Sequence, residues 1–288
     1  PKALTLSGDL GTHDPVVIEA DGQFYELQTG RGIPMNRSRD LSSWQAAGSV
    51  FASNPAWIAQ KVQGATDLWA PDISYFGGSY HVYYSASTFG SNHSCIGHAS
   101  TPSLADAKWT DHGPVICSND GRSDDWNAID PNLVHGEGGA LYLAFGSFWS
   151  GLKLIELDEK GARKGDKVTA IAARPQSNGA IEAPFIVRRC DYYYLFASYD
   201  TCCKGADSRY NIRVGRSKDV AGPYLDRAGT AMLKGGGTQL LIGNATWAGP
   251  GHSAVLSSAR GMFNVYHAYY AASSSGMFRT DASYLHIS

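Results

Sequence analysis

The sequence predicts an all-β fold, a five-bladed β-propeller that takes up residues 1–288 as a single domain. Two observations support this prediction. The composition is rich in glycine (33 residues) and tyrosine (16 residues), which suits many short strands joined by tight turns. A motif also recurs five times along the chain, and such long-period self-similarity is typical of propellers and solenoids.

The motif has four parts: a polar stretch with a proline, an apolar strand, a Gly or Asp turn, and a strand rich in Tyr or Phe. Each unit has room for the four short strands of a blade. Proline is tolerated at the first residue of a strand, where its missing N–H removes no interior ladder bond. The copies begin at His13-Asp14-Pro15, Trp69-Ala70-Pro71, Ile129-Asp130-Pro131, Glu182-Ala183-Pro184 and Gly249-Pro250-Gly251-His252-Ser253, and their prolines are 56, 60, 53 and 66 positions apart (15 to 71, 71 to 131, 131 to 184, 184 to 250).

Few segments favour a helix, and residues 56–62 and 103–108 are expected to form short turns at most. The terminal segments 4–6 and 284–287 have two possible arrangements: they join one blade as strands, or they pack without strand exchange. The alternative fold is a β-sandwich whose hairpins merely resemble one another.

The charge balance excludes several classes of partner. Charged residues make up 17% of the chain and the formal net charge is −2, whereas binding to nucleic acid or to a membrane surface usually requires a marked basic excess. No apolar run approaches the roughly 20 residues that span a bilayer. We therefore expect no nucleic-acid or membrane partner, a neutral or small ligand, and a monomer.

Five cysteines and three sequons bear on the compartment. Cys95 and Cys117 are spaced to close a loop, while Cys202 and Cys203 either form a vicinal disulfide or have separate partners, and an odd count leaves one thiol over. The chain begins without an apolar signal segment, as a processed secreted protein does. We expect an extracellular protein, with glycans possible at the sequons Asn36-Arg-Ser, Asn92-His-Ser and Asn244-Ala-Thr.

Three of the motif copies carry an acid, namely Asp14, Asp130 and Glu182. The first strand of each propeller blade lines the central channel, so these side chains are expected to converge in matching register. Like charges raise each other's ionisation cost, and folds tolerate this chiefly at metal or catalytic sites. The other interpretation is that each acid only caps a turn.

Glycoside cleavage suits such a trio. An inverting hydrolase uses one carboxylate to activate water and one carboxylic acid to protonate the leaving oxygen, roughly 6.5–9.5 Å apart. A third acid can raise the pKa of the proton donor and hold it in place. Retaining chemistry, with carboxyl groups about 5 Å apart, stays open at this point.

The motifs together resemble glycoside hydrolase family 43, and within it the endo-1,5-α-L-arabinanases, the fungal ones especially. The resemblance runs through all five blades. It rests on the segments His13-Asp14-Pro15, Leu68-Trp69-Ala70-Pro71-Asp72, Asn127-Ala128-Ile129-Asp130-Pro131-Asn132, Gly146-Ser147-Phe148-Trp149 and Ile181-Glu182-Ala183-Pro184-Phe185.

The resemblance implies a role for each acid and an inverting reaction. Asp14 would be the general base that activates water, and Glu182 the general acid. Asp130 would tune the pKa of the acid and orient it. His13, which precedes the base, is expected to help orient it.

The resemblance also implies substrate and metal contacts. Trp69 and Phe89 would stack on arabinose rings, and Asn127 and Ser147 would contact the sugar at the cleavage point. His252, in the fifth blade, would hold a calcium ion together with water. For Trp69 the alternative is a core residue, for Asn127 and Ser147 turn and strand positions, and for His252 a channel histidine without metal. Residues 201–205 (Thr-Cys-Cys-Lys-Gly) are expected to shape the wall of the groove.

The leading hypothesis is therefore an endo-arabinanase. On the same fold, the alternatives are an exo-arabinanase, an α-L-arabinofuranosidase and a β-xylosidase. A carbohydrate-binding propeller without catalysis would be expected to lack one of the three acids. An interaction scaffold would give those acids no purpose, and the Trp-Asp endings of WD-repeat blades are absent from the sequence.

Overall fold

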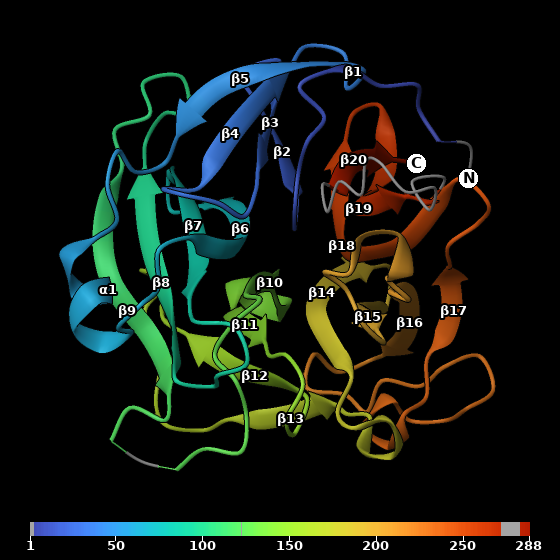
Figure 1. Ribbon diagram of the computed structural model, residues 1–288. Helices are drawn as coiled ribbons and strands as arrows, with labels where there is room; N and C mark the ends of the chain where they lie inside the picture. Colours follow the sequence, from blue (N-terminus) through green and yellow to red (C-terminus); the bar gives the residue numbers. More distant parts are fainter. Residues whose placement is uncertain (1–2, 122, 272–282) are drawn as a thin grey trace.

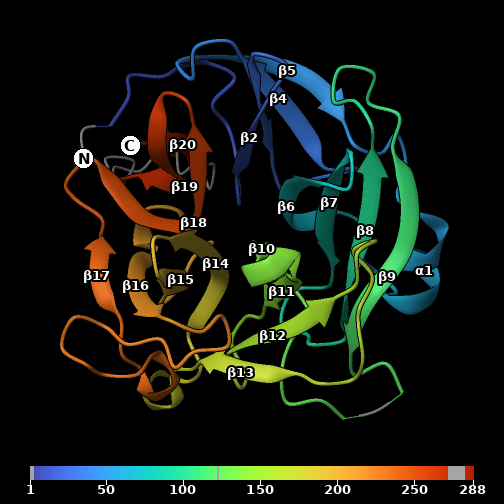
Figure 2. The same cartoon turned by 180° about the vertical axis from the view of Figure 1, so that it is seen from behind.

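The computed structural model describes residues 3–121, 123–271 and 283–288 of the chain. Five antiparallel sheets stand around a central axis like the blades of a propeller, and the prediction of a five-bladed β-propeller is confirmed (Figures 1 and 2). In each sheet the antiparallel strands follow one another in chain order from the axis outward, and one further short strand, Ser7–Gly8, is added in parallel at the outer edge of the first sheet. Among the described residues, no helix has the length and apolar character needed to cross a bilayer.

The first three blades contain the following strands. Blade 1 has β2 (Val16–Ala20), β3 (Gln23–Leu27), β4 (Pro34–Ser38) and β5 (Ser43–Ser49), with β1 (Ser7–Gly8) added in parallel at its outer edge. Blade 2 has β6 (Leu68–Phe76), β7 (Ser79–Ala86), β8 (Ser94–Thr101) and β9 (Thr110–Ser118). Blade 3 has β10 (Asn132–His135), β11 (Leu141–Phe145), β12 (Leu152–Leu157) and β13 (Thr169–Ala172).

The last two blades and the helices complete the chain. Blade 4 has β14 (Ile181–Arg189), β15 (Tyr192–Tyr199), β16 (Asn211–Ser217) and β17 (Thr238–Leu241), and blade 5 has β18 (Trp247–Ser258), β19 (Gly261–Tyr270) and β20 (Ser283–Ile287). The helical turn expected at 56–62 is α1 (Ala56–Lys61), and four 3₁₀ turns lie at Glu137–Gly139, Pro175–Ser177, Gly205–Asp207 and Met232–Lys234.

The N-terminal segment closes the ring of blades. The N–H of Leu4 donates to the carbonyl of Ile287 (2.8 Å), and the N–H of Leu285 donates to the carbonyl of Leu10 (2.8 Å). The segment therefore runs beside β20 of blade 5, while its residues Ser7–Gly8 pair with β5 of blade 1. Both terminal segments thus lie at blade 5, residues 284–287 within strand β20 and residues 4–6 beside it without forming a strand of their own.

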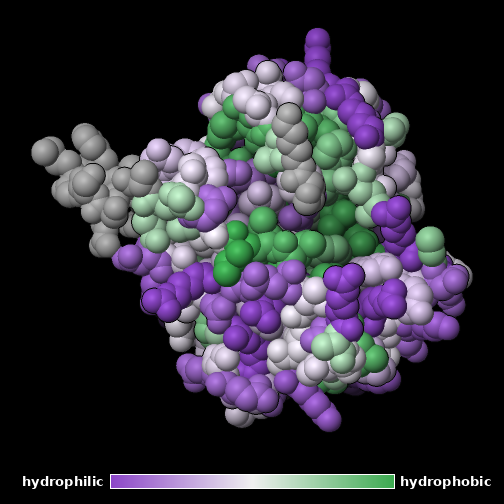
Figure 3. Space-filling view, turned by 90° about the vertical axis from the view of Figure 1, so that its right-hand side faces the viewer, coloured by the Kyte–Doolittle hydropathy of each residue, from purple (hydrophilic) through white to green (hydrophobic). Residues whose placement is uncertain are grey.

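The hydrophobic core lies between neighbouring blades rather than at the axis. One cluster joins blades 1, 2 and 5, and others join blades 3 and 4, blades 2 and 3, and blades 4 and 5. On the outside, Leu240 in β17 at the edge of blade 4 and Ile242 just after it are exposed. Figure 3 shows a band of hydrophobic residues on the side of the molecule that carries this blade.

Two disulfides are present, Cys95–Cys117 and the vicinal pair Cys202–Cys203, and Cys190 is an exposed free thiol. Of the sequon asparagines, Asn36 is buried in β4 with its amide donating to Glu26, so a glycan there would disrupt blade 1. Asn92 donates to two backbone carbonyls. Asn244 is exposed and is the sequon most open to modification.

Candidate active site

The five blades share a left-handed residue at the start of the first strand. These residues, which we call the inner ring, are Asp14, Ala70, Asp130, Ala183 and His252, with φ angles between 46° and 58°. A left-handed backbone is unfavourable for residues other than glycine, so five such residues need compensating contacts. The inner ring aims the side chains of Asp14, Asp130 and His252 into one cleft.

Hydrogen bonds from blade to blade supply that compensation. The N–H of each inner-ring residue donates to a side chain in the preceding blade: Ala70 to Thr29 Oγ1 (2.8 Å), Asp130 to Ser85 Oγ (2.9 Å), His252 to Ser198 Oγ (2.9 Å) and Asp14 to His267 Nδ1 (3.1 Å). In each case the acceptor follows the inner-ring residue of its own blade by 15 positions (14 to 29, 70 to 85, 183 to 198, 252 to 267).

Blade 3 departs from this pattern, and the departure brings Asp130 into the hydrogen bonding between blades. The residue 15 positions after Asp130 is Phe145, but the equivalent place is taken by Gly146, whose N–H donates to the carbonyl of Ile129 (2.8 Å) as that of Thr29 does to His13 (2.9 Å). A Cβ atom on Gly146 would lie 2.8 Å from the carbonyl oxygen of Gly151. Glycine offers no acceptor, and the carboxylate of Asp130 takes its place by accepting the N–H of Ala183 (3.0 Å). Asp130 thus holds, through this hydrogen bond, the peptide group that joins Glu182 to Ala183.

The expectation that all three acids share one register is wrong for Glu182. The inner-ring residue of blade 4 is Ala183, and Glu182 precedes it, in register with Trp69 of blade 2. A β-bulge at both positions turns these side chains toward the cleft as well. In blade 5 the residue after the inner ring is Ser253, so Pro250 does not correspond to the prolines of the other blades.

The predicted site residues come together. A cleft of about 900 Å³ is lined by Asp14, Asp130, Glu182, Trp69, Phe89, Asn127, Ser147 and His252. It is also lined by Thr201, Cys202, Cys203 and Lys204, which confirms the expectation that this segment shapes the groove wall. Trp69 is half-buried and Phe89 is 88% exposed, so neither is a core residue. The Oδ1 atom of Asn127 is buried without a hydrogen-bond partner in the described part of the chain, as suits an atom that receives a ligand hydroxyl.

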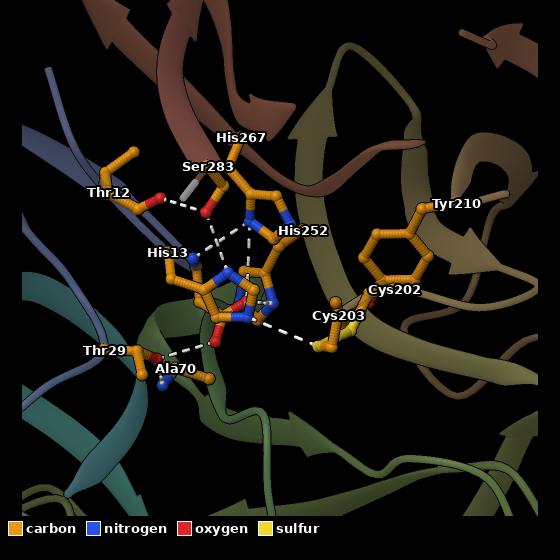
Figure 4. Close-up of polar contacts among 12 residues, drawn as sticks. Thr12, His13, Thr29, Ala70, Cys202, Cys203, Tyr210, His252, His267 and Ser283 are labelled. Carbon is orange, nitrogen blue, oxygen red and sulfur yellow. Dashed lines mark hydrogen bonds and ion pairs between the residues drawn. A yellow bond between two sulfur atoms is a disulfide. The ribbon is translucent and has the colours of Figure 1, made fainter. Parts of the chain in front are cut away.

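Asp14 is surrounded by imidazoles. His252 Nδ1 lies 3.1 Å from Asp14 Oδ1, His13 Nε2 lies 3.6 Å away, and Thr29 donates to Oδ2 (2.7 Å). Figure 4 shows His13, His252 and His267 gathered here, with His13 stacked on His267. Burial by itself raises the pKa of Asp14, but the charges of His13 and His252 outweigh it and hold the pKa well below its usual value. Asp14 is therefore ionised at neutral pH.

Glu182 has the opposite character. Burial raises its pKa, and the hydrogen bonds that Ser147 donates to Oε2 (2.6 Å) and Tyr210 to Oε1 (2.6 Å) only partly offset this. Burial also raises the pKa of Asp130 well above its usual value. Glu182 and Asp130 are thus the carboxyl groups that favour holding a proton, in contrast to Asp14.

Sequence reasoning missed Tyr210, Trp149 and Asp72. Tyr210 is buried and packs where Gly251 leaves room, since a Cβ on Gly251 would lie 1.8 Å from its ring. Trp149 lines the cleft and is 42% exposed. Asp72 is buried, accepts the N–H of Leu133 (2.7 Å), and has a pKa that burial raises to about 7. The spacing of 15 residues in four blades was the one signal in the sequence for the inter-blade acceptors.

A propeller whose cleft holds an ionised carboxylate opposite a carboxyl group with raised pKa, flanked by aromatic side chains, has the site of a glycoside hydrolase. Comparison with known proteins agrees. The model of the family "Glycosyl hydrolases family 43" matches residues 8–282. The chain belongs to this family, as the motifs of the sequence indicated.

The chain is similar to curated relatives, among them these three. An extracellular endo-α-(1→5)-L-arabinanase of Bacillus subtilis is 44% identical over 89% of this chain and 80% of its own. An extracellular exo-α-(1→5)-L-arabinofuranosidase of Cellvibrio japonicus is 42% identical over 90% and 79%. An arabinan endo-1,5-α-L-arabinosidase of Aspergillus aculeatus is 38% identical over 87% and 79%.

Solved structures agree with the fold. The endo-arabinanase of Bacillus licheniformis superimposes with a TM-score of 0.92 at 44% identity, over 99% of this chain and 96% of the other. An α-L-arabinanase of Cellvibrio cellulosa, solved with arabinohexaose, has a TM-score of 0.89 at 39% identity, over 96% and 91%.

Proposed function

We propose that the protein is an endo-1,5-α-L-arabinanase that cleaves internal linkages of arabinan with inversion of configuration. One observation carries the proposal: two carboxyl groups with opposite displacements of the pKa line the same cleft. The names of the relatives supply the sugar and the linkage. A cleft rather than a closed pocket suits a chain that enters from the side.

Asp14 acts as the general base. Its low pKa keeps it ionised, and its Oδ2 is oriented by Thr29, which itself accepts the N–H of Ala70. It takes a proton from the water that attacks the anomeric carbon. His13 and His252 stabilise the carboxylate and hold it in position.

Glu182 acts as the general acid. Its raised pKa keeps the proton available for the leaving oxygen, as general acid catalysis requires. Ser147 and Tyr210 orient its two oxygens, and Asp130 holds the peptide on its C-terminal side. The charge of Asp14 also raises the pKa of Glu182, and Glu182 and Asp130 repel each other when both are ionised, which raises the pKa of Asp130.

Sugar rings pack on Trp69 and Phe89, and the buried Oδ1 of Asn127 accepts a sugar hydroxyl. These side chains bind without reacting, so their loss should weaken binding more than it slows the chemical step.

A calcium ion held by His252 remains a proposal. Nδ1 of His252 faces Asp14, which leaves Nε2 for a cation, but the charges of Asp14, Asp130 and Glu182 raise the pKa of His252 to about 9, so a calcium ion would have to displace a proton from this ring. Calcium prefers oxygen ligands, so water must supply most of its shell. Bound calcium would add positive charge beneath the acids. Adding calcium to chelator-treated protein should raise the unfolding midpoint more than adding magnesium does; equal effects would reject the proposal.

We also propose that the protein is extracellular and monomeric. Two of the curated relatives are named extracellular, and both disulfides suit an oxidising compartment. Sedimentation analysis tests the monomer directly.

One relative favours a second candidate, exo-action on the same linkage, since the Cellvibrio japonicus protein is named an exo-enzyme. A product time course on linear, debranched arabinan separates the two. An endo-enzyme gives mixed oligosaccharides early, with a rapid fall in viscosity. Release of a single short product from the start would reject endo-action, and no cleavage of arabinan would reject the proposed substrate.

A further inference from the structure

The two disulfides of the molecule have different structural consequences. Cys95 on β8 faces Cys117 on β9 across the sheet, 22 positions apart in sequence, so their bond cross-links two strands. Such a link restricts the unfolded chain and stabilises the fold. Cys202 and Cys203 are neighbours, and their bond joins no two elements. Stabilisation of the fold through chain entropy therefore does not account for the vicinal pair.

The vicinal pair lies in the wall of the catalytic cleft. Cys203 Sγ is 3.6 Å from His13 Nε2, which is in turn 3.6 Å from Asp14 Oδ1. Figure 4 shows the disulfide facing the imidazole of His13, with Tyr210 above it. Tyr210 donates to Glu182, so a sugar held between the base and the acid lies next to this disulfide.

The loop that carries the pair is held firmly. The N–H of Cys203 donates to Tyr269 Oη (3.1 Å), the N–H of Lys204 donates to Ser208 Oγ (3.0 Å), and the N–H of Arg209 donates to the carbonyl of Thr201 (2.9 Å). The N–H of Cys203 is thus already bonded, and the disulfide itself presents sulfur and methylene groups to the cleft.

Such a surface suits the apolar face of a sugar ring. Sulfur is polarisable and makes favourable dispersion contacts with carbon atoms. The closed ring also fixes both side chains, so little side-chain entropy is lost when a ligand packs on it. Two free thiols would instead rotate and would offer S–H donors to His13.

We propose that the Cys202–Cys203 disulfide is a substrate-binding element, an apolar wall against which a sugar of the bound polysaccharide packs beside Asp14. This inference rests on the proposed arabinanase function. It assigns the disulfide to the binding of substrate and not to stability of the fold.

The matched test uses the double variant Cys202→Ser/Cys203→Ser, with Cys190→Ser as the control that removes an exposed thiol far from the cleft wall. On linear α-1,5-arabino-oligosaccharides we expect the KM of the double variant to rise about tenfold, as when one apolar contact is lost, while kcat changes less than threefold. The thermal midpoint should stay within about 2 °C of wild type. An unchanged KM in the folded double variant would overturn the proposal, as would a fall in kcat alone, which would mean that the loop only positions Tyr210.

Reduction of wild-type protein provides the second measurement. A phosphine reductant should raise the KM about as much as the double substitution does, oxidised glutathione should restore it, and the double variant should not respond. A chelator selective for zinc over calcium is present throughout, because His13 and two free thiols could bind zinc. A KM that is insensitive to a reduction verified by thiol titration at the pair would contradict the proposal. Failure of the proposed function is a separate result, namely no cleavage of the oligosaccharides by wild type.

Discussion

Asp14 in blade 1 and Glu182 in blade 4 both lie near the start of a first strand, and both line the same cleft. Burial pushes the pKa of both groups upward. The neighbours decide the outcome: imidazoles around Asp14 reverse the effect of burial, whereas the neutral hydroxyls of Ser147 and Tyr210 only moderate it at Glu182. The fold thus prepares two carboxyl groups of one cleft for the proposed roles of base and acid by changing the side chains around each.

The largest expected effect comes from neutralising either carboxyl group. In Asp14→Asn and Glu182→Gln, kcat on arabinan should fall by about 10²- to 10⁴-fold, the range of general acid–base catalysis. Calorimetry should show oligosaccharide affinity within about threefold of wild type. Exposed acids of blade 1 supply the controls Asp21→Asn and Glu19→Gln, which should be fully active. A kcat near wild type in either active-site variant would remove that residue from the mechanism.

Two substitutions of Asp130 separate the effect of its charge from the effect of its hydrogen bond to the N–H of Ala183. Asn keeps an oxygen for the N–H of Ala183 but removes the repulsion between two ionised carboxyl groups, so that the proton on Glu182 is lost at lower pH. Asp130→Asn should therefore shift the alkaline limb of the pH–rate profile to lower pH. Asp130→Ala also frees the peptide next to Glu182 and should reduce kcat about tenfold further than Asn does. Equal kcat values for the two variants would show that the hydrogen bond to Ala183 does not position the acid.

The buried carboxyl group of Asp72, which has no proposed catalytic role, tests whether a pKa raised by burial makes the free energy of unfolding depend on pH. Its pKa in the folded protein, about 7, lies above the ordinary value. The protonated carboxyl group therefore favours folding most strongly below about pH 4. This contribution to the free energy of unfolding is lost as the pH rises from about 4 to about 7. The free energy of unfolding, measured with urea, should fall less between pH 5 and pH 8 in Asp72→Asn than in wild type, by on the order of 2 kcal/mol.

Glu26, whose pKa burial also raises to about 7, is unchanged in both proteins, so the difference between them isolates Asp72. The same pH dependence in wild type and variant would contradict the assignment.

The smallest effect is expected at Tyr210, whose hydroxyl favours the ionised form of Glu182. Tyr210→Phe should lower kcat/KM about tenfold and move the alkaline limb to higher pH, because the pKa of Glu182 rises when this donor is lost. Tyr224→Phe is the control, since Tyr224 donates to the carbonyl of Val220 away from the cleft. An alkaline limb that stays in place would mean that Tyr210 has only a packing role.

The sequence predicted the parts of this account that depend on local patterns. Proline before an apolar strand, repeated five times, was enough to predict the blades and to select Asp14, Asp130 and Glu182. The offset of Glu182 was not visible, because a β-bulge decides which residue before Pro184 takes the left-handed conformation. For the same reason, the sequence suggested that Pro250 is equivalent to the prolines of the other four blades, which it is not.

The rest of the site depends on contacts between blades. Tyr210 reaches Glu182 only because Gly251 of the next blade leaves room for its ring, and no motif surrounds it in sequence. The acceptors Thr29, Ser85, Ser198 and His267 are ordinary residues whose role appears when each blade meets its neighbour. Gly146 breaks their spacing, and this break is what engages Asp130 with the acid.

The most direct test of the different roles of Asp14 and Glu182 is the dependence of rate on the leaving group. Aryl glycosides of an α-1,5-arabino-oligosaccharide with an acidic phenol need no proton from the enzyme. Glu182→Gln should recover about 10²-fold or more of its lost rate on such a substrate, and Asp14→Asn should stay as impaired as it is on arabinan. Recovery by Asp14→Asn, or equal impairment of both variants, would contradict the account.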